Sequence, residues 1–176
     1  MKEKINDIKE AVANKAFQSA LALALTLPDI CGEIEYPTES SAIGTGQFVE
    51  FMSGRKRYAK WCDNYFDFND GHVGFGTEKA ELNGDLLYAL RCAFLHSGND
   101  DLLTQPAGQN AQITKFSLLS PDQLNGYGYQ YKVNSTSAET SIVVDYLIDK
   151  LCSAAENYYD SADDKSVFES HNCTFK

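Results

Sequence analysis

Long apolar runs are missing from this sequence. The longest, residues 16–27, holds only about a dozen residues and is broken by polar side chains, whereas a membrane-spanning helix needs roughly 20 apolar residues. It also resembles a secretory signal poorly, since acidic residues lie among the lysines before it, at Glu3, Asp7 and Glu10. We therefore expect no membrane segment and a cytoplasmic location.

Positive charge is scarce as well. The 176 residues include 15 lysines and arginines against 25 aspartates and glutamates, so the formal net charge is −10. This balance argues against broad, non-specific binding to nucleic acid, which requires a basic surface, although a small local basic site stays open. With 43% apolar and 23% charged residues, the composition is that of a globular protein, and the length favours a single domain.

Clustered metal ligands are the third absence. The sequence has no CxxC, and its five cysteines are widely and irregularly spaced: Cys31, Cys62, Cys92, Cys152 and Cys173. A zinc site needs cysteines and histidines at close spacing, and only His171 and Cys173 meet that condition. We therefore predict reduced thiols, no metal site and no cofactor. The glycine-rich residues 71–76 are too short for a phosphate-binding loop and indicate a turn.

Apolar spacing predicts a mainly helical fold. Pro28 should end or kink the first helix, and residues 29–32 should form a short turn. Gly54 is a candidate break within the second helix. Asn134, Ser135 and Ser137 are candidate N-caps of the last helix. The expected helices cover residues 3–27, 46–66, 78–96 and 137–159.

Two runs have β character instead. Residues 113–119 and 127–133 are rich in β-branched and aromatic residues, and turn-forming residues separate them, which predicts an antiparallel hairpin at about 112–134. The polar residues 161–176 are expected to form a loose tail. The predicted fold is all-α in the main: one four- to five-helix bundle over residues 1–160, with the small β-hairpin inserted before the final helix.

Arg91 is the most informative residue. It is the single charged residue between Leu86 and Leu95, in a helix that is apolar on every side. A buried guanidinium without a partner costs several kcal/mol, so Arg91 must pair with a carboxylate, face a cleft or lie at an interface. The candidate carboxylates are Asp29, Asp63 and Asp85. His96 follows five residues later, which in an α-helix means roughly 140° of rotation and 7.5 Å of rise. The two backbones would not share a face, although an arginine can reach across.

The segment from Arg91 to His96, RCAFLH, has the form Arg-x4-His. Placed late in a buried helix of an all-α bundle, it resembles the HEPN superfamily, as do the flanking ALRCAFLHSGN and the LTLPDICG run at residues 25–32. The resemblance covers residues 15–100. It implies a homodimeric helical bundle that acts as a metal-independent endoribonuclease in bacterial toxin–antitoxin or defence systems. It also implies an RNA substrate, an antitoxin or defence partner protein, and Arg91 and His96 in a composite site at the dimer interface.

Two interpretations of this pair stay open. As a ribonuclease site, His96 acts as general base or acid on a ribose 2′-hydroxyl, and Arg91 holds the scissile phosphate. As a structural pair, Arg91 binds an internal carboxylate and His96 caps the helix C-terminus. Active HEPN nucleases usually carry a polar residue after the arginine, where this sequence has Cys92. That departure favours the alternative function, a non-catalytic interaction or nucleotide-binding module.

A basic cluster is the second candidate site. Its members are Arg55, Lys56, Arg57 and Lys60, and the aromatic residues Tyr58, Trp61 and Tyr65 alternate with them. This pattern is consistent with an RNA-backbone contact supported by base stacking. Ordinary helix patterning favours the other interpretation, an amphipathic helix with a solvated basic face and an aromatic core face.

Overall fold

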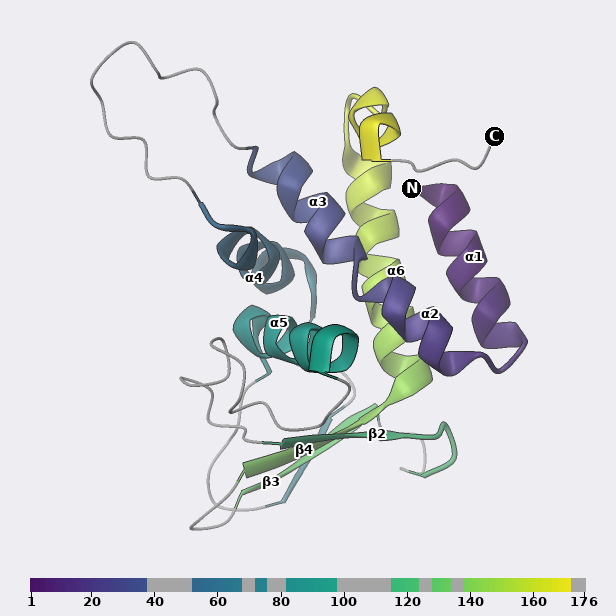
Figure 1. The fold of residues 1–176 in the computed structure, drawn as a ribbon, viewed down its shortest axis with the longest axis vertical. Helices are drawn as coiled ribbons and strands as arrows, with labels where there is room; N and C mark the ends of the chain where they lie inside the picture. Colours follow the sequence, from purple (N-terminus) through teal and green to yellow (C-terminus); the bar gives the residue numbers. More distant parts are fainter. Residues whose placement is uncertain are drawn as a thin grey trace.

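A computed structural model describes residues 1–37, 52–67, 72–75, 82–97, 115–123, 128–133 and 138–171. The helices gather on one side of a small four-stranded sheet (Figure 1). A mainly helical fold with a small β element is therefore confirmed. Among the described residues, no helix is long and apolar enough to cross a membrane.

The N-terminal third contains three helices where the sequence predicts one. They are α1 (Lys2–Ala13), α2 (Phe17–Ala24) and α3 (Leu27–Glu35). Lys15 separates the first two, with a φ of 59° that no helix accommodates. Pro28 lies in the first turn of α3, where its missing N–H donor is no loss. The prediction that Pro28 ends or kinks the first helix and that a turn follows at residues 29–32 is thus wrong, because α2 already ends at Ala24 and Pro28 belongs to the next helix.

Two capped helices follow, α4 (Gly54–Tyr65) and α5 (Gly84–Cys92). The Ser53 side chain accepts a hydrogen bond from the first turn of α4, and the Asn83 side chain does the same for α5. Gly54 begins α4 rather than breaking it. The expected helical residues 46–51 and 78–81 lie outside the described part. At its C-terminal end α5 widens into a π-helix, η1 (Ala93–Ser97).

Glycines let α3, α4 and α5 pack closely. A Cβ atom on Gly32 of α3 would lie 2.9 Å from the Arg57 carbonyl oxygen of α4. A Cβ atom on Gly84 of α5 would overlap the backbone of Ala59, also on α4. Helix α4 is therefore held against both neighbours by close backbone contact, which fixes the start of α3 relative to α5.

The sheet differs from the predicted hairpin. Its strands are β1 (His72–Phe75), β2 (Lys115–Leu119), β3 (Tyr129–Val133) and β4 (Ala138–Val143), in the order β1-β3-β4-β2. Strand β3 pairs antiparallel with β4, whereas the β1–β3 and β2–β4 pairs are parallel. Both predicted strands exist, but β4 lies between them, so the hairpin at 112–134 is wrong. Strand β4 occupies residues expected to open the last helix, because its β-branched residues favour extended backbone: Thr140, Ile142 and Val143.

The last helix, α6 (Val144–Ser161), continues directly from β4 and runs through the middle of the helical layer (Figure 1). A 3₁₀-helix, η4 (Ser166–His171), then folds back onto it. Phe168 is only 3% exposed and packs edge-on against Tyr158 and Tyr159. The expectation of a loose tail from residue 161 therefore does not hold for residues 166–171.

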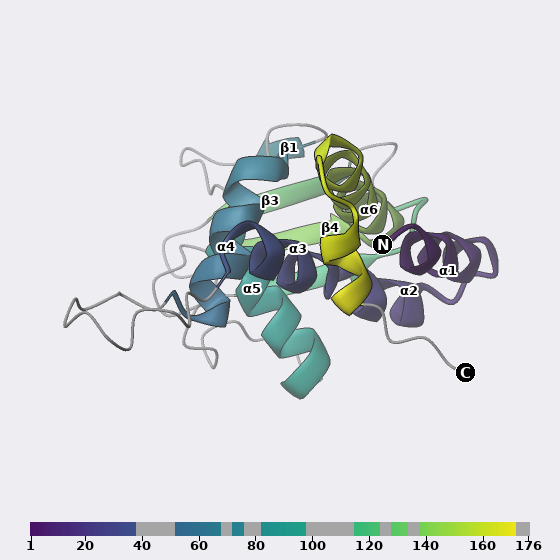
Figure 2. The same cartoon turned by 90° about the horizontal axis from the view of Figure 1, so that it is seen from above.

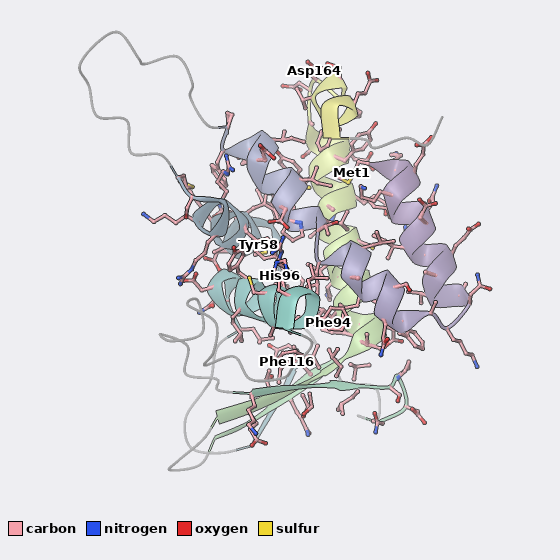
Figure 3. The ribbon with its side chains drawn as sticks, viewed as in Figure 1. Met1, Tyr58, Phe94, His96, Phe116 and Asp164 are labelled. Carbon is pink, nitrogen blue, oxygen red and sulfur yellow. The ribbon has the colours of Figure 1, made fainter. Side chains whose placement is uncertain are left out.

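One hydrophobic core joins the helices to the sheet. Phe116 of β2 lies between the sheet and α5 (Figure 3) and is 4% exposed. The largest fully buried side chains come from α1 to α5 and β4: Ile5, Ile8, Leu21, Leu25, Leu27, Tyr58, Trp61, Leu87, Leu90 and Ile142.

Candidate functional site

Arg91, His96 and Asp29 form one hydrogen-bonded group. Arg91 donates from Nε to Asp29 Oδ2 at 3.2 Å, and its Nη2 lies 3.1 Å from the same oxygen. Its Nη1 lies 2.9 Å from His96 Nε2. The two residues of the Arg-x4-His motif are thus in contact, and the carboxylate partner is one of the three that the sequence proposes.

The π-helix explains why residues five apart meet. In an α-helix, Arg91 and His96 would point in different directions. A π-helix hydrogen-bonds residue i to residue i+5, so its wider winding brings residues of that spacing nearly into line. The winding of Ala93–Ser97 therefore turns His96 back toward Arg91. Local π-turns of this kind occur often at functional sites.

The other candidate carboxylates have different partners. Asp63 accepts a hydrogen bond from the Gly84 backbone N–H at 2.7 Å, at the start of α5. Asp85 lies 3.0 Å from Arg55 Nε. Asp29, in the first turn of α3, is therefore the carboxylate that faces Arg91.

The Arg91–Asp29 pair is partly shielded from water. The side chains are 20% and 34% exposed. Burial raises the pKa of the Asp29 carboxyl above its ordinary value, although Arg91 opposes this effect. Burial acts to lower the pKa of Arg91, but Asp29 and Cys92 outweigh it and leave that pKa raised. Arg91 is therefore a fixed cation in this site.

The Arg91 contact determines the tautomer of His96. A guanidinium has donors only, so His96 Nε2 must accept the hydrogen bond. The imidazole is then neutral and carries its proton on Nδ1. Its Nε2 lone pair becomes free to take a proton whenever Arg91 turns toward another acceptor. The group thus contains a cation that can hold an anion and a base beside it.

Two tyrosines lie behind the ion pair. The Arg91 guanidinium carbon is 5.7 Å from the centre of the Tyr88 ring, and Tyr58 meets that ring edge-on at 5.3 Å. Tyr58 comes from α4, and His96 comes from η1 at the C-terminal end of α5 (Figure 3). Sequence reasoning missed Tyr88, although its spacing of three residues from Arg91 places both on one helix face.

The basic cluster of α4 is divided by its neighbours. Arg55 pairs with Asp85, the Lys60 ammonium lies 4.4 Å from the centre of the Tyr36 ring, and Arg57 acts electrostatically on Asp29. Lys56 is exposed. The aromatic residues do not form the expected stacking surface, because Tyr58 and Trp61 are fully buried and only Tyr65, at 37%, is exposed. An RNA contact by the four basic residues stays a prediction.

Metal ligands do not gather within the described part of the chain, which holds no group of three or more His, Cys, Asp or Glu side chains able to bind a metal ion. Comparison with protein-family models, with curated proteins and with solved structures finds no match. The candidate site therefore stands on its own geometry.

Proposed function

We propose that this protein is a metal-independent endoribonuclease of HEPN type, with Arg91 and His96 as its catalytic residues. The observation that carries the proposal is the 2.9 Å contact between Arg91 Nη1 and His96 Nε2. It joins the anion-binding group and the base that cleavage of a phosphodiester by its own 2′-hydroxyl requires.

The reaction needs no group beyond these side chains and the RNA. The scissile phosphate takes over donors of Arg91, which releases the Nε2 lone pair of His96. His96 then removes the proton of the ribose 2′-hydroxyl, and the 2′-oxygen attacks the phosphorus. The bond from phosphorus to the 5′-oxygen breaks, and that oxygen leaves with a proton returned by the imidazolium. The products are a 2′,3′-cyclic phosphate and a 5′-hydroxyl.

The proposal includes a homodimer with the site at its interface. The end of α5 with η1 extends past the neighbouring helices (Figure 2). Phe94 and Leu95 on this end are only partly buried. In a symmetric dimer this segment would lie beside its twin, bringing two copies of the site together. A constant monomer mass of 19.5 kDa on dilution, measured by light scattering, would remove the composite site.

The proposal assigns RNA-backbone contacts to Arg55, Lys56, Arg57 and Lys60 on α4, the helix next to α5. It places the protein in the cytoplasm, in a toxin–antitoxin or defence role with an antitoxin or defence protein as partner. Because the net charge is −10, RNA binding must rely on this local basic cluster, and it should weaken steeply with salt.

Cleavage of single-stranded RNA in excess chelator tests the proposal. The wild type should cut, while Arg91→Ala and His96→Ala should each lose cleavage and keep the wild-type circular dichroism spectrum. His171→Ala, which removes a histidine that is not part of the Arg-x4-His motif, should cut like the wild type. Full cleavage by either site variant contradicts the assignment.

A second candidate function is a non-catalytic interaction or nucleotide-binding module. The observation that favours it is that Arg91 already has partners, since its donors meet Asp29 and His96 and its Nη1 lies 4.0 Å from Cys92 Sγ. In that case the Arg91 group holds α3 against α5, and the chain binds a partner or nucleotide without cutting RNA.

A further inference from the structure

The Tyr58 hydroxyl is a buried polar group without a partner. Tyr58 is 0% exposed, and no described residue accepts a hydrogen bond from its hydroxyl. A buried donor left without an acceptor is costly and rare in folded proteins. The site described above gives this hydroxyl no role.

Helix packing places Tyr58 next to the two helices that carry the ion pair. Toward α5, the Tyr58 ring meets Tyr88, and the Arg91 guanidinium lies over the Tyr88 ring. Toward α3, the Tyr58 backbone nitrogen would lie 3.4 Å from a Cβ atom on Gly32, one helical turn beyond Asp29. Tyr58 is therefore a residue of α4 that is buried between α3 and α5.

The electrostatics of Tyr58 agree with this placement. Burial raises the pKa of its hydroxyl well above the ordinary value, and its neighbours Cys62 and Asp29 raise it further. Arg91 acts in the opposite direction. The hydroxyl thus stays protonated as a donor, within the field of the Asp29 carboxylate.

We propose that Tyr58 is a positioning residue of the anion site: when an RNA phosphodiester takes over Arg91, the Tyr58 hydroxyl donates to the Asp29 carboxylate that Arg91 leaves. In this exchange of partners, the RNA phosphate accepts hydrogen bonds from Arg91, and the Asp29 carboxylate accepts one from Tyr58. Without Tyr58, ligand binding would strand a largely buried carboxylate, and the ligand would bind more weakly by the cost of that stranded charge. The inference rests on the proposed function, because it takes Arg91 to be the phosphate-binding group.

The test measures binding separately from cleavage. The probe is a single-stranded RNA oligonucleotide with 2′-O-methyl groups, which lacks the attacking hydroxyl. For Tyr58→Phe, the Kd of this oligonucleotide should rise roughly 10- to 100-fold, the value of a hydrogen bond to a charged group. Its melting temperature without RNA should be unchanged or slightly raised, because the lost hydroxyl has no partner in the free protein.

Tyr158→Phe is the matched control. Its hydroxyl donates to Glu35 Oε2 at 2.9 Å, away from the site. This variant should show the opposite pattern, with a lower melting temperature and an unchanged Kd. A double-mutant cycle of Tyr58 and Asp29 distinguishes a positioning role of Tyr58 from a purely structural one. In an Asp29→Ala background, Tyr58→Phe should have no further effect on the Kd, since the carboxylate that it serves is gone.

The outcomes separate the two proposals. If Arg91→Ala no longer binds the oligonucleotide while Tyr58→Phe binds it like the wild type, the proposed role of Tyr58 is wrong. The proposal that Arg91 binds phosphate then still holds. A large fall in the melting temperature of Tyr58→Phe, or the same loss of affinity in the Asp29→Ala background, also overturns the exchange. If the Kd behaves as expected but the wild type does not cut all-ribose RNA, the exchange stands and the ribonuclease fails. If the wild type does not bind the oligonucleotide, both fall.

Discussion

Removing Arg91 should destabilise the protein measurably, because the change leaves the Asp29 carboxylate without its cation. Breaking a fully buried ion pair costs about 3–5 kcal/mol, whereas an exposed pair contributes about 0–1 kcal/mol. With side chains 20% and 34% exposed, this pair falls between those limits. We therefore expect Arg91→Ala to lose about 2 kcal/mol of folding free energy.

For a chain of this length, that loss lowers the melting temperature by about 4–8 °C. The melts must be recorded at equal protein concentration, since the melting point of a dimer depends on it. Lys9→Ala is the control, because it breaks a pair with Glu156 at a similar distance, 3.0 Å, but with side chains 53% and 39% exposed. It should shift the melting temperature by less than about 3 °C.

The loss of stability caused by Arg91→Ala should also depend on pH. In the folded protein, burial raises the pKa of Asp29 above 3.8, and without Arg91 it should rise further. A carboxyl whose pKa is raised on folding costs nothing below its unfolded pKa. Its destabilising effect grows as the pH rises from the unfolded pKa to the folded pKa, and it is constant above the folded pKa. The melting temperatures of the wild type and Arg91→Ala should therefore converge as the pH falls toward 3.8. Equal melting temperatures of the wild type and Arg91→Ala at pH 7 would contradict a stabilising role of the Arg91–Asp29 pair.

Two further pairs of variants test the fold by chemical denaturation. Gly84→Ala should lose about 3 kcal/mol, because its Cβ would overlap the Ala59 backbone, whereas Gly54→Ala, with open space around it, should change stability by less than about 1 kcal/mol. Phe168→Ala should lose about 3 kcal/mol, since the ring is buried against α6, whereas the 40% exposed Val167 should tolerate alanine within about 0.5 kcal/mol. Equal effects within either pair would contradict the packing described.

Sequence patterns predicted those features that depend on local spacing. Apolar periodicity indicated most of the helical segments, and runs rich in β-branched and aromatic residues indicated β2 and β3. The single charge in an apolar helix indicated that Arg91 pairs with a carboxylate, faces a cleft or lies at an interface, and Asp29 was among the three candidate carboxylates. The reason is general: burial of a guanidinium demands a partner, whatever the details of the fold.

Features that depend on tertiary structure could not be predicted from the sequence. The sequence predicts a helix over the residues of strand β4, because the candidate N-caps Asn134, Ser135 and Ser137 lie directly before them, and only pairing with β2 and β3 decides for the strand. The π-helix depends on how α5 ends against its neighbours, so spacing alone put Arg91 and His96 on different faces. The full burial of Tyr58 could not be read from a helix that alternates basic and aromatic residues.

In the proposed reaction, Arg91 and His96 cleave RNA by promoting attack of the RNA's own 2′-hydroxyl on the adjacent phosphorus. The most direct measurement uses an oligonucleotide of deoxyribonucleotides with a single ribonucleotide, incubated with the purified protein in excess chelator. We expect the wild type to cut this oligonucleotide once, on the 3′ side of the ribonucleotide, and to leave a 2′,3′-cyclic phosphate. We also expect no cut by His96→Ala or when that sugar carries a 2′-O-methyl group. No cleavage by the wild type, or equal cleavage by His96→Ala, would contradict the proposed reaction.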